Sequence, residues 1–397
     1  MGGRRWVRVA AAAAVVFAGC SSTATSHSQA TTSTTSPSST TSAAEPPPSE
    51  SATTASPSRV PIRHVFIVML ENKSYEETWG ASSVATYLNH TLVPQGVLLA
   101  NYYGIGHNSL DNYIAEISGQ APNPSTQADC PVYTPFSATG TGAYGQLLGK
   151  GCVFPASVQT VADQLDTKGL TWKTYQEDIG NSATEPKTCR HPQLGAVDRT
   201  LVARPGDQYA TRHDPFVYFT SITDSPSCAT QVVGLDQLTG DLTSVATTPN
   251  FAFITPNLCH DGHDQPCVDG EPGGLVSADA FLSQWVPRIL ASPAFKKDGM
   301  LVITFDEAEV SGSHGDASAC CQTPPSPNAA RPGLIGPGGG RVGALVISVA
   351  TKPGTTDATS YNHYGLLCSV EDVFHLDHLG FAGAPGTPCF GDDVYNG

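Results

Sequence analysis

Basic residues are scarce in this chain. Among its 397 residues, 20 are Lys or Arg and 35 are Asp or Glu, which gives a formal net charge of −15 at pH 7. Nucleic acids and anionic lipid surfaces attract proteins through clustered positive charge, so the composition argues against both as electrostatic partners. A phosphate-bearing substrate would need positive charge supplied locally, by a few side chains or by a metal ion.

Two motifs of well-understood chemistry are also missing. No Cys-x-x-Cys pair occurs among the 11 cysteines, which argues against a zinc cluster. No Gly-x-Ser-x-Gly is present, so a serine hydrolase with a nucleophile elbow is disfavoured. The sequence contains no internal repeat, and no second linker follows residue 61. We therefore expect one large domain at 61–397, long enough to bury a sizeable core.

The first 60 residues differ in character from the rest. Residues 1–19 predict a secretion signal, because three arginines flank the start of a short apolar run at 9–17. The segment 17–20, Phe-Ala-Gly-Cys, is similar to the site where a bacterial lipoprotein is cleaved and acylated; an ordinary signal peptide with a chance cysteine is the alternative. Residues 20–60 are mostly Ser, Thr, Ala and Pro, which is typical of a disordered tether. We predict an exported lipoprotein, facing the cell envelope or extracellular space, whose only membrane contact is a lipid on Cys20.

Ten cysteines remain once Cys20 is set aside, and all lie in the globular part. An even number in an exported protein predicts up to five disulfides. The adjacent Cys320 and Cys321 are expected to bond two different partners. Two local pairs are plausible: Cys259 with Cys267, and Cys368 with Cys389.

Strand-like and helix-like segments alternate along the globular part. This alternation predicts an α/β fold with a mainly parallel central sheet that is covered by helices on both faces. Segments rich in Gly, Pro, Ser and Cys are expected to form long, disulfide-tied loops over the sheet: 120–157, 178–210 and 308–341. The expected strands are 64–70, 96–101, 170–175, 250–255, 300–305 and 342–349, and the expected helices are 109–118, 158–168, 276–296 and 363–376.

Acidic and amide side chains follow two of the most apolar strands. The strand at 64–70 is followed by Glu71 and Asn72, and the strand at 300–305 by Asp306 and Glu307. Ligands of parallel sheets bind at the carboxyl ends of the strands, so these side chains can meet at one point. Hard oxygen ligands gathered there suggest a bound cation. Taken separately, each pair has a simpler interpretation, a helix cap or a solvated loop.

Ser109 stands at the start of an amphipathic helix, just after His107. The amides at a helix start favour an anionic group, so a serine there can be a nucleophile that bonds covalently to phosphorus. A neighbouring metal would lower the pKa of its hydroxyl and remove the need for a Ser-His-Asp triad. The commoner role of a serine in this position is a plain N-cap.

Histidines gather in three further segments. The loop 259–264 after a strand holds two His and two Asp, and suits a general acid, a phosphoryl-oxygen donor or a metal ligand. Arg212 and His213 together suit phosphoryl-oxygen recognition, or form a surface turn. His363 opens the last helix and either faces the site or caps that helix. His375 and His378 have a zinc-like spacing, but we interpret them as a packed or exposed helical face.

These segments, in this order, resemble the bacterial phosphoesterase family that includes secreted acid phosphatases and phospholipases C. The Glu-Asn-x-Ser after one strand, together with Asp-Glu after a later strand, is fairly specific. The resemblance spans nearly all of residues 64–376. The matching stretches are HVFIVMLENKSYEETWG, GHNSLDNYIAEISG, YQEDIG, RHDPFVYF, FITPNLCHDGHD, LVITFDEAE and YNHYGLLCSVEDVF.

The resemblance implies an alkaline-phosphatase-like α/β sandwich and assigns roles by position. It implies Ser109 as nucleophile, with His107, His213 and His263 also catalytic. Two departures stand out: Tyr75 replaces a usual Phe, and Asp111 replaces a common Pro two residues after the nucleophile. An extra carboxylate there could repel phosphate or bind the metal. The implied metal ligands are Glu71, Asn72, Ser109, Asp306 and Glu307, and the substrate-binding residues are Arg212, His260, Asp264 and His363.

The sequence therefore favours a metal-dependent phosphoric monoester hydrolase of the acid phosphatase type. One divalent ion is expected; oxygen ligands suit Ca²⁺ or Mg²⁺, and the histidines keep Zn²⁺ or Fe open. A phospholipase C-type phosphodiesterase is the first alternative, but the loops 120–157 and 308–341 are Gly- and Ser-rich rather than apolar, which favours monoesters. The second alternative is a catalytically inactive surface lipoprotein that binds a ligand.

Overall fold

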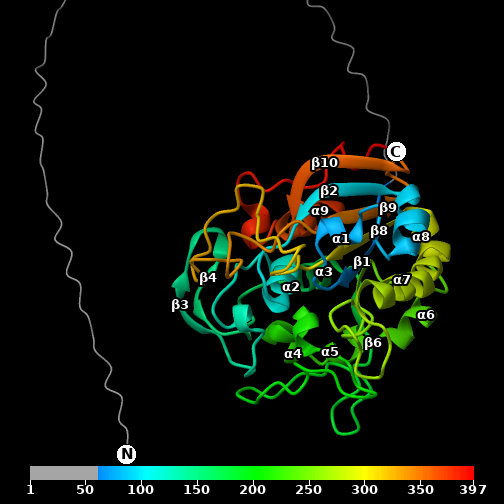
Figure 1. Ribbon diagram of the computed structural model, residues 1–397. Coiled ribbons are helices and arrows are strands. Elements are labelled where there is room, and N and C mark those ends of the chain that lie inside the picture. The colour runs from blue at the N-terminus through cyan, green and yellow to red at the C-terminus, as the bar shows by residue number, and fades with distance from the viewer. Residues whose placement is uncertain (1–60) are drawn as a thin grey trace, which may run out of the picture. The chain divides into compact units, whose positions relative to one another are not determined.

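Eight strands form one sheet at the centre of residues 61–397, the part of the chain that this computed structural model describes (Figure 1). The predicted signal, lipidation site and tether lie outside the described residues. Across the sheet the strands run β10 (Thr355–Asn362), β2 (Val97–Tyr103), β9 (Ala344–Ser348), β8 (Gly299–Phe305), β1 (His64–Leu70), β7 (Phe251–Thr255), β5 (Trp172–Gln176) and β6 (Val232–Gly234).

The sheet is mostly parallel, which confirms the predicted fold class. Only β9 runs against its neighbours, β2 and β8. β1 lies near the middle, parallel to both β8 and β7. Leu70 pairs with Phe305, so the residues that follow these two strands leave the sheet side by side at its carboxyl edge.

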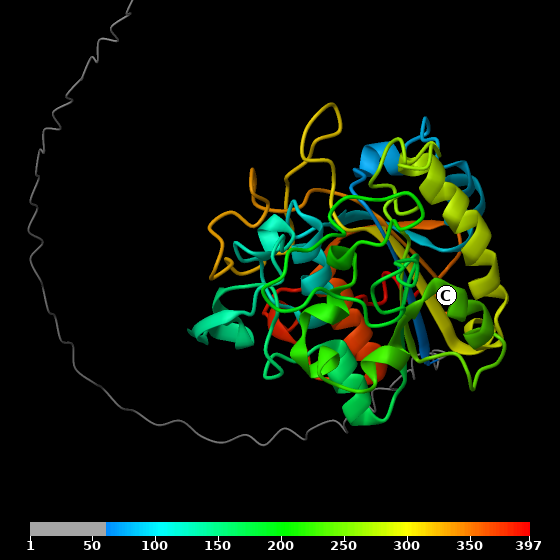
Figure 2. The same ribbon diagram turned by 90° about the horizontal axis from the view of Figure 1, so that it is seen from below.

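Helices cover both faces of the sheet (Figure 2). α2 (Ser109–Ser118), α3 (Val161–Lys168) and α9 (His363–Phe374) contact one another on one face. α7 (Gly274–Ala291) and α8 (Pro293–Asp298) cover the other. The expected single helix at 276–296 is two helices, because Ser292 takes an extended backbone and caps α8 while Pro293 starts it.

Short elements complete the described part. They include the hairpin β3–β4, which lies inside the predicted loop 120–157 and pairs outside the main sheet. No helix among residues 61–397 combines the length and apolar character needed to cross a bilayer. The bounds are β3 (Ser137–Thr141), β4 (Leu147–Lys150), α1 (Tyr75–Thr78), α4 (Thr220–Thr223), α5 (Cys228–Gln231) and α6 (Leu238–Asp241).

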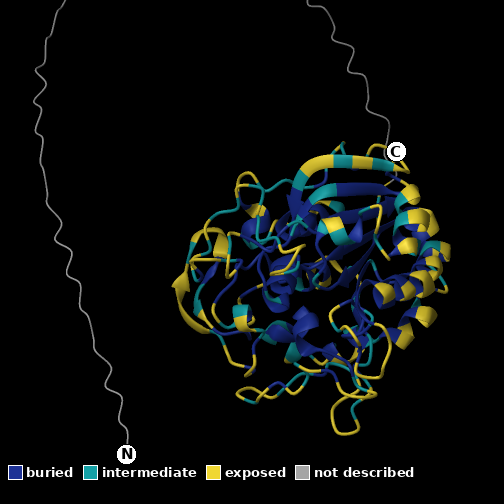
Figure 3. Ribbon diagram, viewed as in Figure 1, coloured by how far each residue is buried: buried dark blue, intermediate teal, exposed yellow. Residues whose placement is uncertain are grey.

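The central strands are buried along their whole length, as Figure 3 shows by colour. Every residue of β1 and β8 is buried, because helices remove both faces of these strands from water. Burying one Val, Leu or Ile side chain contributes roughly 1.5–3 kcal/mol, so these strands hold much of the stability. β10 was not predicted, because this edge strand is polar and largely exposed and its sequence lacks an apolar run.

The ten cysteines form five disulfides, as expected from their even number. Both predicted local pairs, Cys259–Cys267 and Cys368–Cys389, are confirmed. The prediction for Cys320 and Cys321 is wrong, since they bond to each other. The other cysteines pair elsewhere in the fold, which leaves these two only each other. Those other pairs are Cys130–Cys152 and Cys189–Cys228.

Candidate active site

The side chains that follow β1 and β8 meet at the carboxyl edge of the sheet. The Asn72 backbone N–H donates to Asp306 Oδ1 at 3.1 Å, and its side-chain amide donates to Glu307 Oε1 at 2.8 Å. Asn72 has a φ of 48°, a left-handed conformation that its short polar side chain tolerates. Glu71, Asp306 and Glu307 are all buried. The structure thus brings together the four strand-end residues that the sequence singled out.

Ser109 lies against this group at the first residue of α2. Its Oγ donates to Glu71 Oε2 at 2.8 Å, and the Tyr113 hydroxyl donates to Glu71 Oε1 at 2.6 Å. Ser109 is almost fully buried. Asn108, and not Ser109, takes the N-cap position of α2, so the serine hydroxyl is directed at the acid rather than used as a cap.

Asp261 belongs to the same group, although the sequence analysis gave it no role of its own. Asp261 Oδ2 lies 3.0 Å from His213 Nδ1, and His213 Nε2 lies 3.2 Å from Glu71 Oε1. The His213 ring stacks on Tyr113 with centroids 5.4 Å apart. Ligand atoms of Glu71, His213 and Asp261 all lie within 4.8 Å of one another. The signal for Asp261 was its place after β7, the strand beside β1.

Burial dominates the electrostatics of this carboxylate cluster. It raises the pKa of Glu71, and it raises the pKa of Asp261 well above the usual range, where the negative charge of Glu71 adds to the effect of burial. The pKa values of Asp306 and Glu307 are likewise raised well above the usual range, first by burial and then by neighbouring carboxylates. Burial lowers the pKa of His213 well below its usual value, and charge on Arg212 and His263 acts in the same direction.

A divalent cation fits these residues. Asp306 Oδ2 and Asn72 Oδ1 are buried, and neither has a hydrogen-bond donor among residues 61–397. Buried acceptors without a donor are costly, as are several carboxylates at one point, unless positive charge is present. The donor set is oxygen-rich, which suits a hard ion, while His213 offers one ring nitrogen beside it.

Basic side chains reach the rim of the cluster from the 3-10 helix at Thr211–His213 and from the loop after β7. Arg212 Nη2 lies 3.1 Å from His263 Nε2, and His263 Nδ1 lies 2.8 Å from Asp264 Oδ1. Arg212 is buried, whereas about a third of the His263 side chain is exposed. The pair Arg212–His263 therefore stands between the buried acids and the solvent.

The other predicted site residues have different surroundings. His107 is buried, which lowers its pKa, and it lies beside Asp316. The ring nitrogens of His260 face Glu177 and Glu271, and the hydrogen bond that His260 donates to the Glu177 carboxylate is the main reason why the pKa of His260 is raised to about 9.

His363 is placed behind the cluster. Its Nδ1 lies 2.9 Å from Glu116 Oε1, and its Nε2 lies 2.5 Å from the backbone oxygen of Asp306. The ring thus holds the strand end rather than presenting a free nitrogen. His375 and His378 follow α9, which ends at Phe374, so they do not share a helical face.

Asp111, the departure noted in the sequence, is fully buried. Neither carboxylate oxygen has a hydrogen-bond donor among the described residues, and burial raises its pKa well above the usual range. Gly106 packs against it, since a Cβ there would stand 2.3 Å from Asp111 Oδ1. A charge on Asp111 raises the pKa of Glu307, so this carboxyl group lies at the edge of the same cluster.

This chain is similar in sequence to a known family and to several curated proteins. The model of the Phosphoesterase family matches residues 81–377. Among curated proteins, a "Probable acid phosphatase" of Kluyveromyces lactis is 26% identical over 318 residues, 80% of this chain and 59% of that protein. A "Phosphate-repressible acid phosphatase" of Penicillium chrysogenum is 28% identical over 289 residues, which are 73% of this chain and 54% of that protein. The chain thus spans less than two thirds of the length of these relatives.

Solved structures show a distant likeness. A protein of the alkaline phosphatase superfamily from Vibrio parahaemolyticus overlaps with 84% of this chain and 72% of its own, at 11% identity and a TM-score of 0.46. A phosphonate monoester hydrolase from Silicibacter pomeroyi overlaps with 84% of this chain and 76% of its own, at 12% identity and a TM-score of 0.43. Likeness at this level carries no conclusion about activity.

Proposed function

Since this chain belongs to the Phosphoesterase family, we propose that it is an exported, metal-dependent phosphoric monoester hydrolase with Ser109 as nucleophile. One observation carries the proposal. Ser109 Oγ donates to a buried carboxylate, Glu71, at the sheet edge where Asp306 and its neighbours meet. The acid phosphatases among its relatives are consistent with this activity.

Glu71, Asn72, Asp306, Glu307 and Ser109 would hold the cation, with His213 and Asp261 beside it. When bound, the ion would lower the pKa of the serine hydroxyl and offset negative charge on the phosphoryl oxygens. Arg212 adds positive charge at the rim, which suits the phosphoryl oxygens of a bound ester.

Proton transfer is assigned to two groups. Glu71 Oε2, which accepts a hydrogen bond from Ser109 Oγ, takes the serine proton as Oγ bonds to phosphorus. His263, protonated at Nε2, gives that proton to the departing alcohol as the ester P–O bond breaks. Water then attacks the phosphoserine and gives a proton to His263, while Glu71 returns its proton to Ser109 Oγ as the bond from Oγ to phosphorus breaks. Phosphate is released, and Ser109, Glu71 and His263 are restored.

The test is hydrolysis of an aryl phosphate by residues 61–397, which lie in one compact unit. Ser109→Ala and Asp306→Ala are compared with Ser118→Ala, which removes a buried hydroxyl from the other end of α2. We expect the first two variants, and chelator, to abolish activity, and Ser118→Ala to retain it.

Three other results would redirect the proposal. Activity that survives Ser109→Ala would exclude this nucleophile and make His263 the next candidate. Hydrolysis of phosphatidylcholine without hydrolysis of monoesters would favour the phospholipase C-type diesterase. Tight cation binding with no hydrolysis of either substrate would favour the inactive surface-binding lipoprotein.

A further inference from the structure

A cavity of about 730 Å³ opens beside the site. We call it the apolar pocket. Its walls come from residues that are distant in sequence, among them Ile105 and Pro122 on one side and Tyr364 and Phe381 on another. The remaining wall is the loop 308–341, which contributes alanines, several prolines, Ile335 and the Cys320–Cys321 disulfide. Its volume is in the range of pockets that bury a small organic ligand.

The pocket's charge sets it apart from the rest of the protein. Its lining holds no Asp or Glu, although the whole chain has a net charge of −15. Arg331 is its single charged lining residue and is exposed. An apolar space without acidic side chains suits an uncharged, apolar group.

The pocket shares structure with the active site on two sides. Gly104, in its wall, packs on the strand end of β8, because a Cβ there would stand 2.5 Å from the Asp306 carbonyl oxygen and 3.2 Å from Glu307 Cα. At its lip, the backbone oxygens of Arg331 and Pro332 each accept a hydrogen bond from Gln127 Nε2 at 2.8 Å.

Gln127 also contacts the residue that precedes Ser109. Its backbone oxygen accepts a hydrogen bond from the side-chain amide of Asn108, the residue before Ser109. One glutamine therefore joins the lip of the pocket to the start of α2.

We propose that the apolar pocket binds the leaving group of the ester that Ser109 attacks. The substrate class is then a phosphate monoester of an aryl or medium-chain alkyl alcohol. This inference rests on the proposed function and names its substrate. Although the loop 308–341 is rich in Gly and Ser, its alanine and proline side chains line this pocket together with Ile335 and Phe381.

Binding of n-alkylphosphonates, which lack the ester oxygen and are not hydrolysed, tests the pocket without turnover. Calorimetry on residues 61–397, in the presence of a divalent cation, would compare methyl- to hexylphosphonate. We expect affinity to rise about threefold per added methylene until the pocket is filled. In Ile335→Asp, which places a charge at an exposed lining position, this rise should largely disappear.

Leu334→Asp is the matched control. Leu334 is exposed and is adjacent in sequence, but it does not line the pocket. Its φ of 59° is one that Asp tolerates, so the change should not harm folding. This variant should keep the full dependence on chain length.

The outcomes separate this inference from the proposed function. If affinity does not change with chain length, or if both variants respond alike, the pocket does not hold the leaving group, whatever the enzyme hydrolyses. If affinity rises with chain length in the wild type but no monoester is hydrolysed, the pocket stands as a ligand site and the proposed reaction falls. The same series of alkyl phosphates in a hydrolysis assay should show the chain-length dependence in KM.

Discussion

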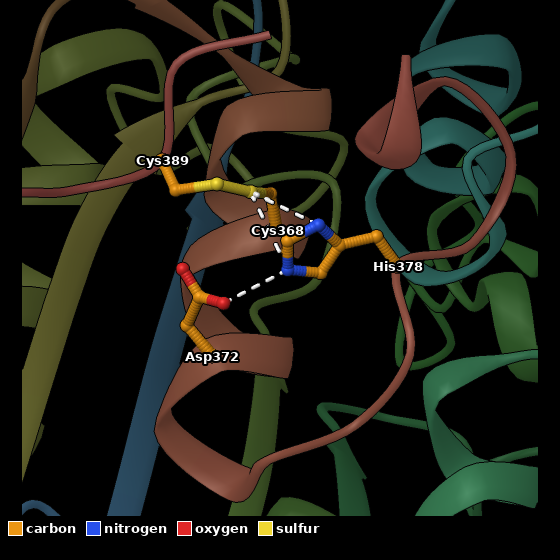
Figure 4. Close-up of side chains that lie close together, drawn as sticks. All are labelled: Cys368, Asp372, His378 and Cys389. Carbon is orange, nitrogen blue, oxygen red and sulfur yellow. Dashed lines mark hydrogen bonds and ion pairs between the residues drawn. A yellow bond between two sulfur atoms is a disulfide. The ribbon is translucent and has the colours of Figure 1, made fainter. Parts of the chain in front are cut away.

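Of the side-chain clusters among residues 61–397 whose residue types could bind a metal, two differ in nearly every physical respect. The strand-end cluster contains Glu71, Asp306, Glu307 and Asp261, all buried. The second, which we call the α9 cluster, consists of Cys368, Asp372, His378 and Cys389 (Figure 4). Its ligand atoms also lie within 4.8 Å of one another.

The side chains of the α9 cluster are already bonded or paired with one another. Cys368 and Cys389 are joined in a disulfide, so neither sulfur is a thiolate that could bind a metal. His378 Nε2 lies 2.9 Å from Asp372 Oδ1, and both of these side chains are substantially exposed. Water screens their charges, so this ion pair contributes little and demands no cation.

The strand-end cluster has the opposite character. Its carboxylates are buried, their pKa values are raised, and Asp306 Oδ2 has no donor among residues 61–397. Residue type and proximity are therefore poor signs of a metal site. Buried negative charge that the protein leaves uncompensated is the better sign.

The largest expected difference between the two clusters is in kcat/KM, when one Asp of each cluster is replaced by Asn. Asp306→Asn should lower kcat/KM on an aryl phosphate by at least about 10³-fold, because loss of the cation removes several kcal/mol of transition-state stabilisation. Asp372→Asn should change it less than about twofold. Equal losses in the two variants would erase the distinction between the clusters.

Removing the disulfide tests whether the α9 cluster is structural. Cys368→Ala with Cys389→Ala opens a link between residues 21 apart in sequence, which should lower the free energy of unfolding by about 3 kcal/mol. Activity per folded molecule should be retained. Chemical denaturation and a parallel assay would measure both, and loss of activity without loss of stability would contradict the structural role.

A bound cation should stabilise the folded protein only by binding at the strand-end cluster. A free divalent cation at about 100 times its Kd should raise the free energy of unfolding by about 2.7 kcal/mol, relative to the protein in chelator. The resulting rise in Tm should vanish in Asp306→Asn and persist in Asp372→Asn. A rise that instead depended on Asp372 would move the metal to the α9 cluster.

A smaller effect is expected from pH at Glu371, a buried acid on α9. Burial raises its pKa to about 9, and its Oε1 accepts the Leu379 N–H at 2.9 Å. A raised carboxyl pKa stabilises the folded state below the ordinary value of about 4.3, and this contribution is lost as pH rises towards 9. Gln keeps the acceptor without ionising. Thermal melts should therefore show the Tm of Glu371→Gln rising by several °C relative to that of the wild type between pH 5 and pH 8. No change in that difference would mean that Glu371 titrates normally.

Local patterns in the sequence predicted much of the fold. The apolar runs of β1 and β8 and the helix starting at Ser109 were placed within a residue, because burial on both faces leaves an unmistakable apolar run. The polar edge strand β10 gave no such signal, and Pro293 divided a helix that was expected to be continuous.

The same limits apply to the site. The acids at the ends of β1 and β8 were found because strand ends meet at one edge of a parallel sheet. The contact between Asp261 and His213 was not predicted, since it joins two segments 48 residues apart through the order of the strands. The pairing of Cys320 with Cys321 depended on where every other cysteine fell.

The sequence by itself determined the acidic charge, the buried strands, the acids that follow them and the serine at a helix start, since each is a property of neighbouring residues. Only the tertiary structure decided that Asp261 joins the cluster, that His363 supports it from behind, and that alanines and prolines of the loop 308–341 enclose an apolar pocket. The physical reason is that these features depend on strand order and loop path. Those bring together residues far apart in the chain, and local sequence patterns do not record such contacts.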